Sequence, residues 1–290
     1  MRTLPLLILF SGIAFGQSLI VTAEGHHGMA PAQLLKDDLS VEVNRHPARV
    51  TDLIPLRGNQ ANLELFIVID DGADSDLGNQ FGALRTFMNA QPATTRVGLA
   101  YLRNGSAMIA APMANDHEQV AKSLRIPLGQ PGIAASPYMG ITDLIKKWPA
   151  ADARREVLLI SSGIDPWSPP DPQNPYLREA IAQAQRGGVL VHSIYYAGAG
   201  HAGHSLSRSN WGANYLSELG DATGGEAYWQ GTSSPVSIDP FLKELGQRLN
   251  NQYLLTVDAG ETKEDLEPIR VSTSKPGVSV VSASQLHVRR

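Results

Sequence analysis

The segment from Leu63 to Asp74 constrains the fold of this chain more than any other part of the sequence. It joins a mostly apolar, β-branched run to acidic and small residues. Apolar residues then recur at the spacing of one helical face, at Leu77, Phe81, Leu84 and Met88. A buried strand that leads through a loop into a helix begins an α/β unit. Open α/β sheets bind ligands at the carboxyl ends of their strands, so we expect Asp70, Asp71 and Asp74 near a site.

Strand and helix patterns continue to alternate after this unit. We expect strands at 63–70, 95–102, 107–111, 157–161, 189–195, 227–229 and 253–257. We expect helices at 77–89, 116–124, 136–148, 177–187, 211–222 and 239–249. Ser136 before Pro137 is a strong helix start, and Asn104-Gly105 is a typical hairpin turn. The alternation predicts an α/β fold with a doubly wound, mostly parallel sheet, helices on both faces, and flanking N- and C-terminal β segments.

Residues 1–16 have the pattern of a secretory signal peptide. Arg2 precedes an apolar run, and Ala14 and Gly16 are small residues at the positions expected for cleavage before Gln17. The alternative is an N-terminal membrane anchor, but the run is short for a span of about 20 residues. No later stretch is long and apolar enough to cross a bilayer. We therefore expect a secreted or periplasmic protein with no membrane span after cleavage.

Two β-rich segments flank the α/β pattern. Short strand patterns fill residues 17–59, and alternating apolar and polar residues fill residues 258–290. We therefore expect an N-terminal β segment, a main domain at 60–257 and a C-terminal β segment. The sequence leaves open whether the two β segments pair as one module.

Composition and motifs argue against several classes of function. The net charge is −4, and no basic cluster points to nucleic acid. The chain has 0 cysteines, which excludes thiol chemistry and thiolate zinc sites. Gly198-x-Gly200-x-x-Gly203 matches the dinucleotide fingerprint in letters, but no apolar helical face follows it, so we interpret it as a loop. His201 and His204 lack the further ligands that zinc requires.

Three features that follow one another along the chain together resemble the von Willebrand factor type A domain. They are the strand ending at Asp70, the helix start at Ser136 and the strand that ends in Ser161-Ser162-Gly163. The pattern is similar to the secreted von Willebrand factor A-related family of Acidobacteria and similar bacteria. Its markers here are Leu-Phe-Ile-Val-Ile-Asp-Asp, Thr223-Gly224-Gly225 and Asn251-Gln252-Tyr253-Leu254-Leu255. The resemblance covers about residues 17 to 288.

The resemblance implies a metal-ion-dependent adhesion site, and this sequence departs from its pattern. The family pattern is Asp-x-Ser-x-Ser in the first loop, Thr in the second and Asp in the third. Here Asp70 is kept, and the other positions hold Gly72, Asp74, Ser136 and Ser162. One direct ligand and one charged anchor are missing, while Asp71 and Asp74 add negative charge. Two alternatives stay open: Mg²⁺ or Ca²⁺ bound by Asp70, Asp74 and Ser136 in altered geometry, or a site without metal.

The function implied is a non-enzymatic binding or adhesion module. Asp70, Asp74, Ser136 and the loop from Gly163 to Tyr176 would contact a protein, or a matrix or glycan ligand. The candidate contact residues in this surface or next to it are Asp71, Ser162, Asp165 and Trp167. The proline-rich stretch from Pro166 to Pro175 is either a stiff surface loop or an exposed aromatic contact surface. The alternatives are a structural envelope scaffold with no metal and, more distantly, a metal-dependent hydrolase.

Overall fold

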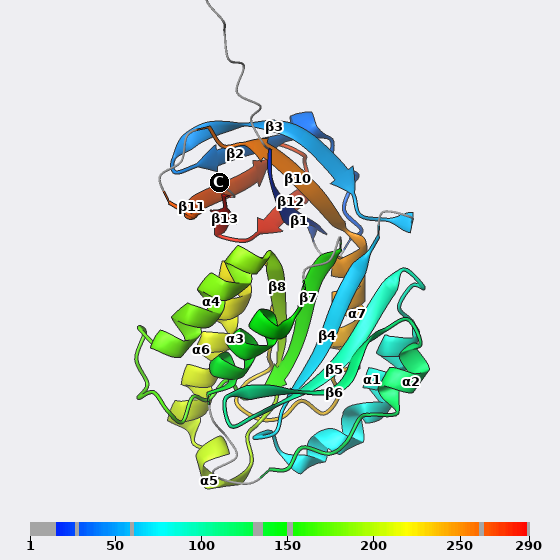
Figure 1. Ribbon diagram of the computed structural model, residues 1–290, viewed down its shortest axis with the longest axis vertical. Coiled ribbons are helices and arrows are strands. Elements are labelled where there is room, and N and C mark those ends of the chain that lie inside the picture. The colour runs from blue at the N-terminus through cyan, green and yellow to red at the C-terminus, as the bar shows by residue number, and fades with distance from the viewer. Residues whose placement is uncertain are drawn as a thin grey trace, which may run out of the picture.

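The computed structural model describes residues 16–26, 29–58, 61–129, 136–149, 153–260 and 264–288. Residues 1–15, most of the predicted signal peptide, lie outside the described residues. The described chain forms two sheets, one placed above the other in Figure 1. Among the described residues, no helix has the length and apolar character that a bilayer crossing needs.

The lower unit in Figure 1 is built on a six-stranded sheet of order β6-β5-β4-β7-β8-β9. Neighbouring strands are parallel except for the antiparallel pair β5 and β6. The strands are β4 (Leu63–Asp70), β5 (Thr95–Arg103), β6 (Ser106–Ala114), β7 (Arg154–Ser161), β8 (Val189–Tyr195) and β9 (Ala227–Tyr228). Asn104 and Gly105 form the predicted hairpin turn, with φ of 52° and 72°.

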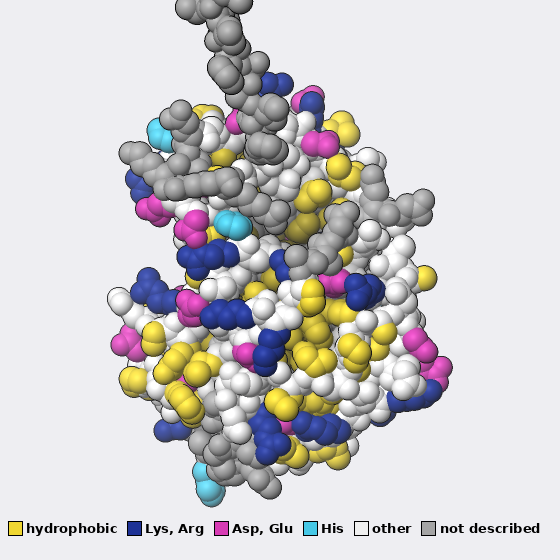
Figure 2. Space-filling view, in the orientation of Figure 1, with side chains coloured by type: hydrophobic (Ala, Val, Ile, Leu, Met, Phe, Trp, Pro, Cys, Tyr) yellow, Lys and Arg dark blue, Asp and Glu magenta, His cyan; other side chains and the backbone are white. Residues whose placement is uncertain are grey.

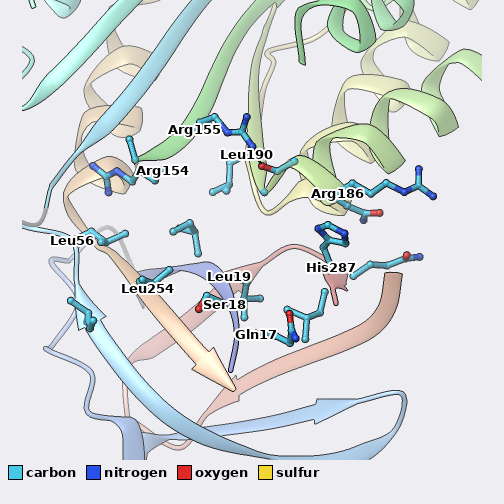
Figure 3. Close-up of a pocket in the computed structure, with 18 of the residues that line it drawn as sticks. Gln17, Ser18, Leu19, Leu56, Arg154, Arg155, Arg186, Leu190, Leu254 and His287 are labelled. Atoms are coloured by element: carbon cyan, nitrogen blue, oxygen red, sulfur yellow. Dashed lines mark hydrogen bonds between the residues drawn. The ribbon is translucent and has the colours of Figure 1, made fainter. Parts of the chain in front are cut away.

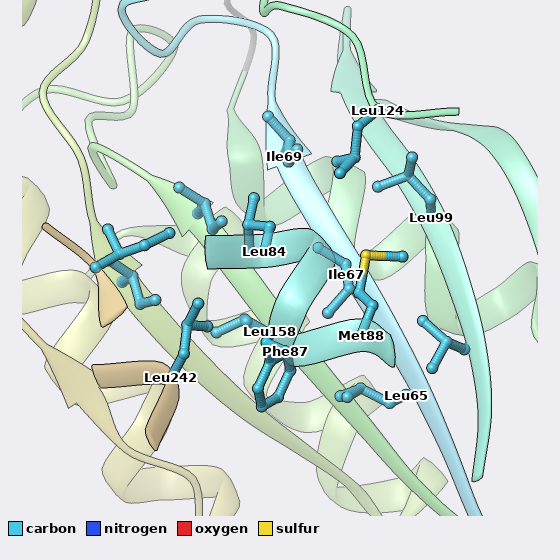
Figure 4. Close-up of a cluster of buried hydrophobic side chains, with 14 of the residues drawn as sticks. Leu65, Ile67, Ile69, Leu84, Phe87, Met88, Leu99, Leu124, Leu158 and Leu242 are labelled. Carbon is cyan, nitrogen blue, oxygen red and sulfur yellow. The ribbon is translucent and has the colours of Figure 1, made fainter. Parts of the chain in front are cut away.

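Helices cover both faces of this sheet. One face carries α1 (Phe81–Asn89), α2 (His117–Ala121) and α7 (Asp239–Asn250), and the other carries α3 (Pro137–Lys147), α4 (Pro175–Gly187) and α6 (Leu206–Thr223). Two short helices, η4 (Ser75–Gln80) and α5 (Gly200–Gly203), lie in loops. Figure 4 shows the first face, where Leu84 and Met88 of α1 pack on Ile67 and Leu99. We expected no helix directly after Gly203, but α6 already begins at Leu206.

The upper unit is a curled, seven-stranded antiparallel sheet of order β12-β1-β10-β3-β2-β11-β13. Its elements are β1 (Gln17–Gly25), η2 (Lys36–Asp38), β2 (Leu39–Val43), β3 (His46–Pro55), β10 (Gln252–Asp258), β11 (Leu266–Thr273), β12 (Val278–Ser282) and β13 (Gln285–His287). The two ends of the chain thus pair in one sheet around a buried cluster that includes Val21, Val41 and Leu255. The α/β unit is inserted between β3 and β10, which are neighbours in this sheet.

The predicted fold class, one doubly wound and mostly parallel sheet with small flanking β segments, is wrong. The protein has a mixed six-stranded sheet and a larger antiparallel sheet. We placed 253–257 last in the parallel sheet, but β10 pairs antiparallel with β1 and β3. Periodicity identifies a strand, but it does not identify the partner, and here Leu255 pairs with the sequence-distant Leu19.

Candidate functional site

The carboxyl ends of the parallel strands meet at the edge of the six-stranded sheet that faces away from the seven-stranded sheet, at the bottom of Figure 1. We call this edge the rim; it consists of Ser136 and the loops 71–80, 124–129, 162–174, 196–205 and 229–238. Ser161 Oγ donates to Asp70 Oδ2 over 2.7 Å, and Tyr138 OH donates to the Gly163 carbonyl over 2.7 Å. These bonds hold the end of β4, the start of α3 and the loop after β7 side by side.

Asp70 is the last residue of β4 and is 6% exposed. Its Oδ1 accepts a hydrogen bond from the Gly72 N–H over 2.8 Å, and its Oδ2 accepts the Ser161 hydroxyl. Burial raises the pKa of Asp70, while both hydrogen bonds oppose the rise. The carboxylate therefore fixes the first rim loop against β7.

Asp71 is fully buried and forms a two-pronged salt bridge with Arg125, with N–O distances of 2.6 and 2.7 Å. The Arg125 guanidinium lies 3.8 Å from the centre of the Tyr101 ring. The Tyr101 hydroxyl donates to the Arg125 carbonyl and accepts its N–H. Asp71, a predicted contact residue, is thus held inside the protein. Its partner is 54 residues away in the chain, so no local pattern could have indicated the pair.

Asp74 joins two rim loops. Its Oδ1 accepts the Asp76 N–H over 3.2 Å and so caps η4. Its Oδ2 lies 3.6 Å from His204 Nε2, which belongs to the loop before α6. The side chain is about one-third exposed, which makes Asp74 the most accessible of the three predicted metal ligands.

Asp165 is the centre of a buried hydrogen-bond cluster. Its Oδ2 accepts from Ser136 Oγ over 2.8 Å and from Asn174 Nδ2 over 2.9 Å, and its Oδ1 accepts the Trp167 N–H over 2.9 Å. Asn174 also caps α4, because its Oδ1 accepts two N–H groups of the first turn. The cap could have been predicted, since Asn before Pro175 is a helix-start signal. The cluster joins the start of α3 to the loop before α4.

Ser162 stands where the resemblance places a third-loop acid, and its side chain is nearly buried. The next residue, Gly163, has φ of 66° and packs on Gly212 of α6. A Cβ at Gly163 would lie 2.3 Å from the Gly212 carbonyl oxygen, so a side chain there would push α6 away. This close contact places α6 directly beside the third rim loop.

The donor set at the predicted metal ligands does not fit Mg²⁺, which needs near-octahedral coordination by oxygen atoms. Gly72 has no side-chain oxygen, the Ser136 hydroxyl donates to Asp165, and both oxygens of Asp70 accept protein hydrogen bonds. Within the described ranges, no three His, Asp or Glu side chains are grouped to hold a metal ion. Cation binding by Asp70, Asp74 and Ser136 stays a prediction.

A pocket of 290 Å³ lies between the third rim loop and α6. Trp167, 58% exposed, lines it together with Trp211 and Arg208 of α6. We expected the loop and Trp167 to form a contact surface. Sequence reasoning missed Arg208 and assigned Trp211 only to a helix face, because the approach of α6 to this loop depends on the two glycines.

A second cavity, of 680 Å³, lies between the two units (Figure 3). Leu19 and Leu254 of the upper sheet face Leu190 of β8 across it, and Arg155 and Arg186 extend from its edge. Both arginines bind within the protein, Arg155 to the Gly187 carbonyl and Arg186 to Asp265. This cavity therefore belongs to the packing of the two units.

No protein-family model and no curated protein sequence match the chain. Solved structures similar to it include BatB, a conserved hypothetical protein from Bacteroides thetaiotaomicron, with 12% identity and a TM-score of 0.46 over 64% of this chain and 97% of that chain. They also include the VWA domain of SpRpn10, with 11% identity and a TM-score of 0.43 over 69% of this chain and 98% of that chain. Proximal thread matrix protein 1 from the mussel byssus has 13% identity and a TM-score of 0.46 over 63% of this chain and 47% of that chain.

The six-stranded sheet has a helical layer on each face and its loops gather at the rim, as the sequence resemblance to the von Willebrand factor type A domain implies. Membership in the secreted von Willebrand factor A-related family of bacteria stays a prediction.

Proposed function

We propose that this chain is a non-enzymatic module that binds a protein through the rim, in the cell envelope or outside the cell. The observation that carries the proposal is the distribution of exposed apolar side chains. Of the ten large hydrophobic residues exposed in the described chain, five lie in rim loops, namely Ile126, Leu128, Trp167, Trp229 and Val236, and a sixth, Leu206, begins α6 directly after a rim loop. Exposed apolar groups concentrated on one surface are typical of a protein interface.

The rim is also rigid enough to bind without large ordering costs. Asp70, Asp71 and Asp165 each hold a rim loop through hydrogen bonds inside the protein. A contact surface that is already in its bound shape loses little conformational entropy on association. In this proposal the acidic residues position the loops, the exposed aromatic residues contact the partner, and no cation is required.

Selection of peptides from a random phage-displayed library tests the proposal. The mature chain, from Gln17 onward, should enrich peptides whose affinity falls about tenfold or more on Trp167→Ala, as at a hot spot. Met108→Ala is the matched control, because Met108 is 54% exposed on the edge strand β6, outside the loops that form the rim. Peptides that depend on Met108 but not on Trp167 would contradict the proposal.

A second candidate is assembly into an envelope scaffold, and the edge strand β6 favours it. Residues 106–114 contain no charged side chain, and Met108 and Ile109 are exposed. Edge strands without charge can pair with other strands, and Pro112 limits such pairing to the first half of β6. Light scattering of the mature chain tests assembly: a stable oligomer that Ile109→Lys dissociates would favour it.

A further inference from the structure

Six of the eleven residues that line the pocket between the third rim loop and α6 carry a proline or aromatic ring. Its lining residues are Ile164, Asp165, Pro166, Trp167, Ser168, Pro169, Pro170, Arg208, Trp211, Gly212 and Tyr215. We call it the proline–tryptophan pocket. Figure 2 shows hydrophobic side chains gathered at the lower left, over the loop that precedes α4. At 290 Å³ the pocket is large enough for one or two side chains, but small for a whole ligand of drug size.

The pocket is formed before any partner arrives. Asp165 fixes the base of the loop through Ser136 and Asn174. At the far end of the loop, the Tyr215 hydroxyl accepts the Asp171 N–H over 2.9 Å and donates to the Asp171 carbonyl over 2.8 Å. The prolines between these points have fixed φ angles. The aromatic walls are therefore held apart at a set spacing.

The pocket carries a single available charge at its edge. Arg208 lies in the first turn of α6, which contains no acidic residue, and it forms no ion pair within the described part of the chain. The other charged lining residue, Asp165, is buried and has hydrogen bonds to both oxygens. The positive end of the α6 dipole adds to the field of Arg208. The charge at this pocket is complementary to a carboxylate.

We propose that the proline–tryptophan pocket binds an extended, proline-containing peptide that carries a carboxylate next to the proline. The proline ring packs between Trp167 and Trp211, and the carboxylate pairs with Arg208. Aromatic-lined grooves suit such peptides because the polyproline II conformation is preformed and leaves its carbonyl groups free for indole N–H donors. This inference rests on the proposed function, since it names the partner chemistry of one part of the rim.

Fluorescence anisotropy tests the inference with a pool of labelled nine-residue peptides. The pool places one proline and one aspartate at every pair of positions in an alanine background. Some members should bind saturably, and their affinity should fall about tenfold when the proline becomes alanine or on Trp167→Ala. Arg208→Ala should remove the preference for aspartate over asparagine. Both side chains are exposed at the surface, so the variants should fold, and circular dichroism checks this.

Several outcomes would overturn the inference. Absence of saturable binding by the whole pool is one, and equal binding of lysine-for-aspartate peptides is another. Self-association of the mature chain that Trp167→Ala abolishes would assign the pocket to a second copy. Library peptides that need Trp167 but neither proline nor an acid would overturn this inference and keep the proposed function. Library peptides whose affinity is unchanged by Trp167→Ala would contradict the proposed function itself.

Discussion

The two ends of the six-stranded sheet use buried acids in the same way but differ in what they expose. At the amino-terminal end, Glu156 is buried against the upper sheet and pairs with His192. At the rim, Asp70 and Asp71 are buried and pair within the protein as well. Only the rim combines this internal pairing with a concentration of exposed aromatic and aliphatic side chains. The comparison indicates that buried acids shape both ends, and in our proposal the exposed apolar groups of the rim contact the partner.

The junction with the upper sheet is held by a buried polar network. His192 Nδ1 accepts the Glu226 N–H over 3.1 Å, so the ring proton lies on Nε2, which donates to Glu156 over 2.8 Å. Arg154 donates to Gln252 of β10 over 2.6 Å. The contact between Arg154 and Gln252 crosses from the α/β unit to the strand that follows it and helps to fix how the two units sit.

The largest effect is expected at this junction. Glu156→Ala leaves His192 and Arg154 without their buried carboxylate and should lower the free energy of unfolding by about 3–5 kcal/mol. Urea denaturation measures the change. Glu118→Ala is the control, because Glu118 pairs with Lys122 on the exposed face of a helix and should cost about 0.5 kcal/mol or less. Equal costs for the two substitutions would remove the contrast between junction and surface.

At the rim, Asp71→Ala should destabilise by about 2–3 kcal/mol, somewhat less than Glu156→Ala. The partner side chain of Arg125 is 41% exposed and can be hydrated after the loss of Asp71, whereas His192 has no exposure. The same urea measurement applies. Peptide binding at Trp167 should survive in the fraction that remains folded. A stable Asp71→Ala variant that has lost peptide binding would instead make Asp71 a contact residue.

Acid titration should distinguish the two ends, because stability should change with pH in opposite directions at each of them. Burial acts to raise the pKa of Glu156, but the interactions with His192, Arg154 and Gln252 together outweigh it, so the pKa is lowered. Its stabilisation is present above the ordinary value of 4.5 and is lost as pH falls through the lowered pKa. The pKa of Asp70 is raised by burial, so its cost is present above that pKa and is relieved as pH falls through it. Stability differences from Glu156→Gln and Asp70→Asn, followed against pH, should therefore change in opposite directions.

The smallest effect is expected from metal ions. Calorimetry with Mg²⁺, Ca²⁺ or Mn²⁺ at millimolar concentration should give no saturable heat, because the hydrogen bonds of Asp70 and Ser136 are already made within the protein. Saturable heat that Asp70→Ala abolishes would restore the adhesion-site prediction and contradict a rim that binds its partner without a cation.

Local patterns predicted most elements of the chain but not their assembly into sheets. The run at 63–70 matches β4, and the signals at Pro137 and Gly188 mark the start of α3 and the cap of α4. These features depend on neighbours in sequence. The pairing of β10 with β1 depends on packing between segments at opposite ends of the chain, which periodicity does not encode.

The candidate site was also predicted only in part, and the reason is the same. Asp70 was identified at a strand end, Ser136 at a helix start, and Asp165 in the loop between them and the next helix. Arg125, the partner of Asp71, was not identified, because a hydrogen bond between distant loops leaves no local trace in the sequence. Asn174, the partner of Asp165, was also missed, although its position before Pro175 is a helix-start signal. Without these partners the acids resembled ligands for a cation, whereas in the structure they hold loops together.

Hydrogen exchange of the mature chain, with and without a library-selected peptide and in the presence of EDTA, tests the central claim most directly. Binding at the rim predicts slower exchange in residues 163–176 and in the first turns of α6, with the upper sheet unchanged. Protection confined to the upper sheet or to β6, or protection that disappears when EDTA removes divalent cations, would contradict the claim that this protein binds its partner through exposed apolar side chains of the rim.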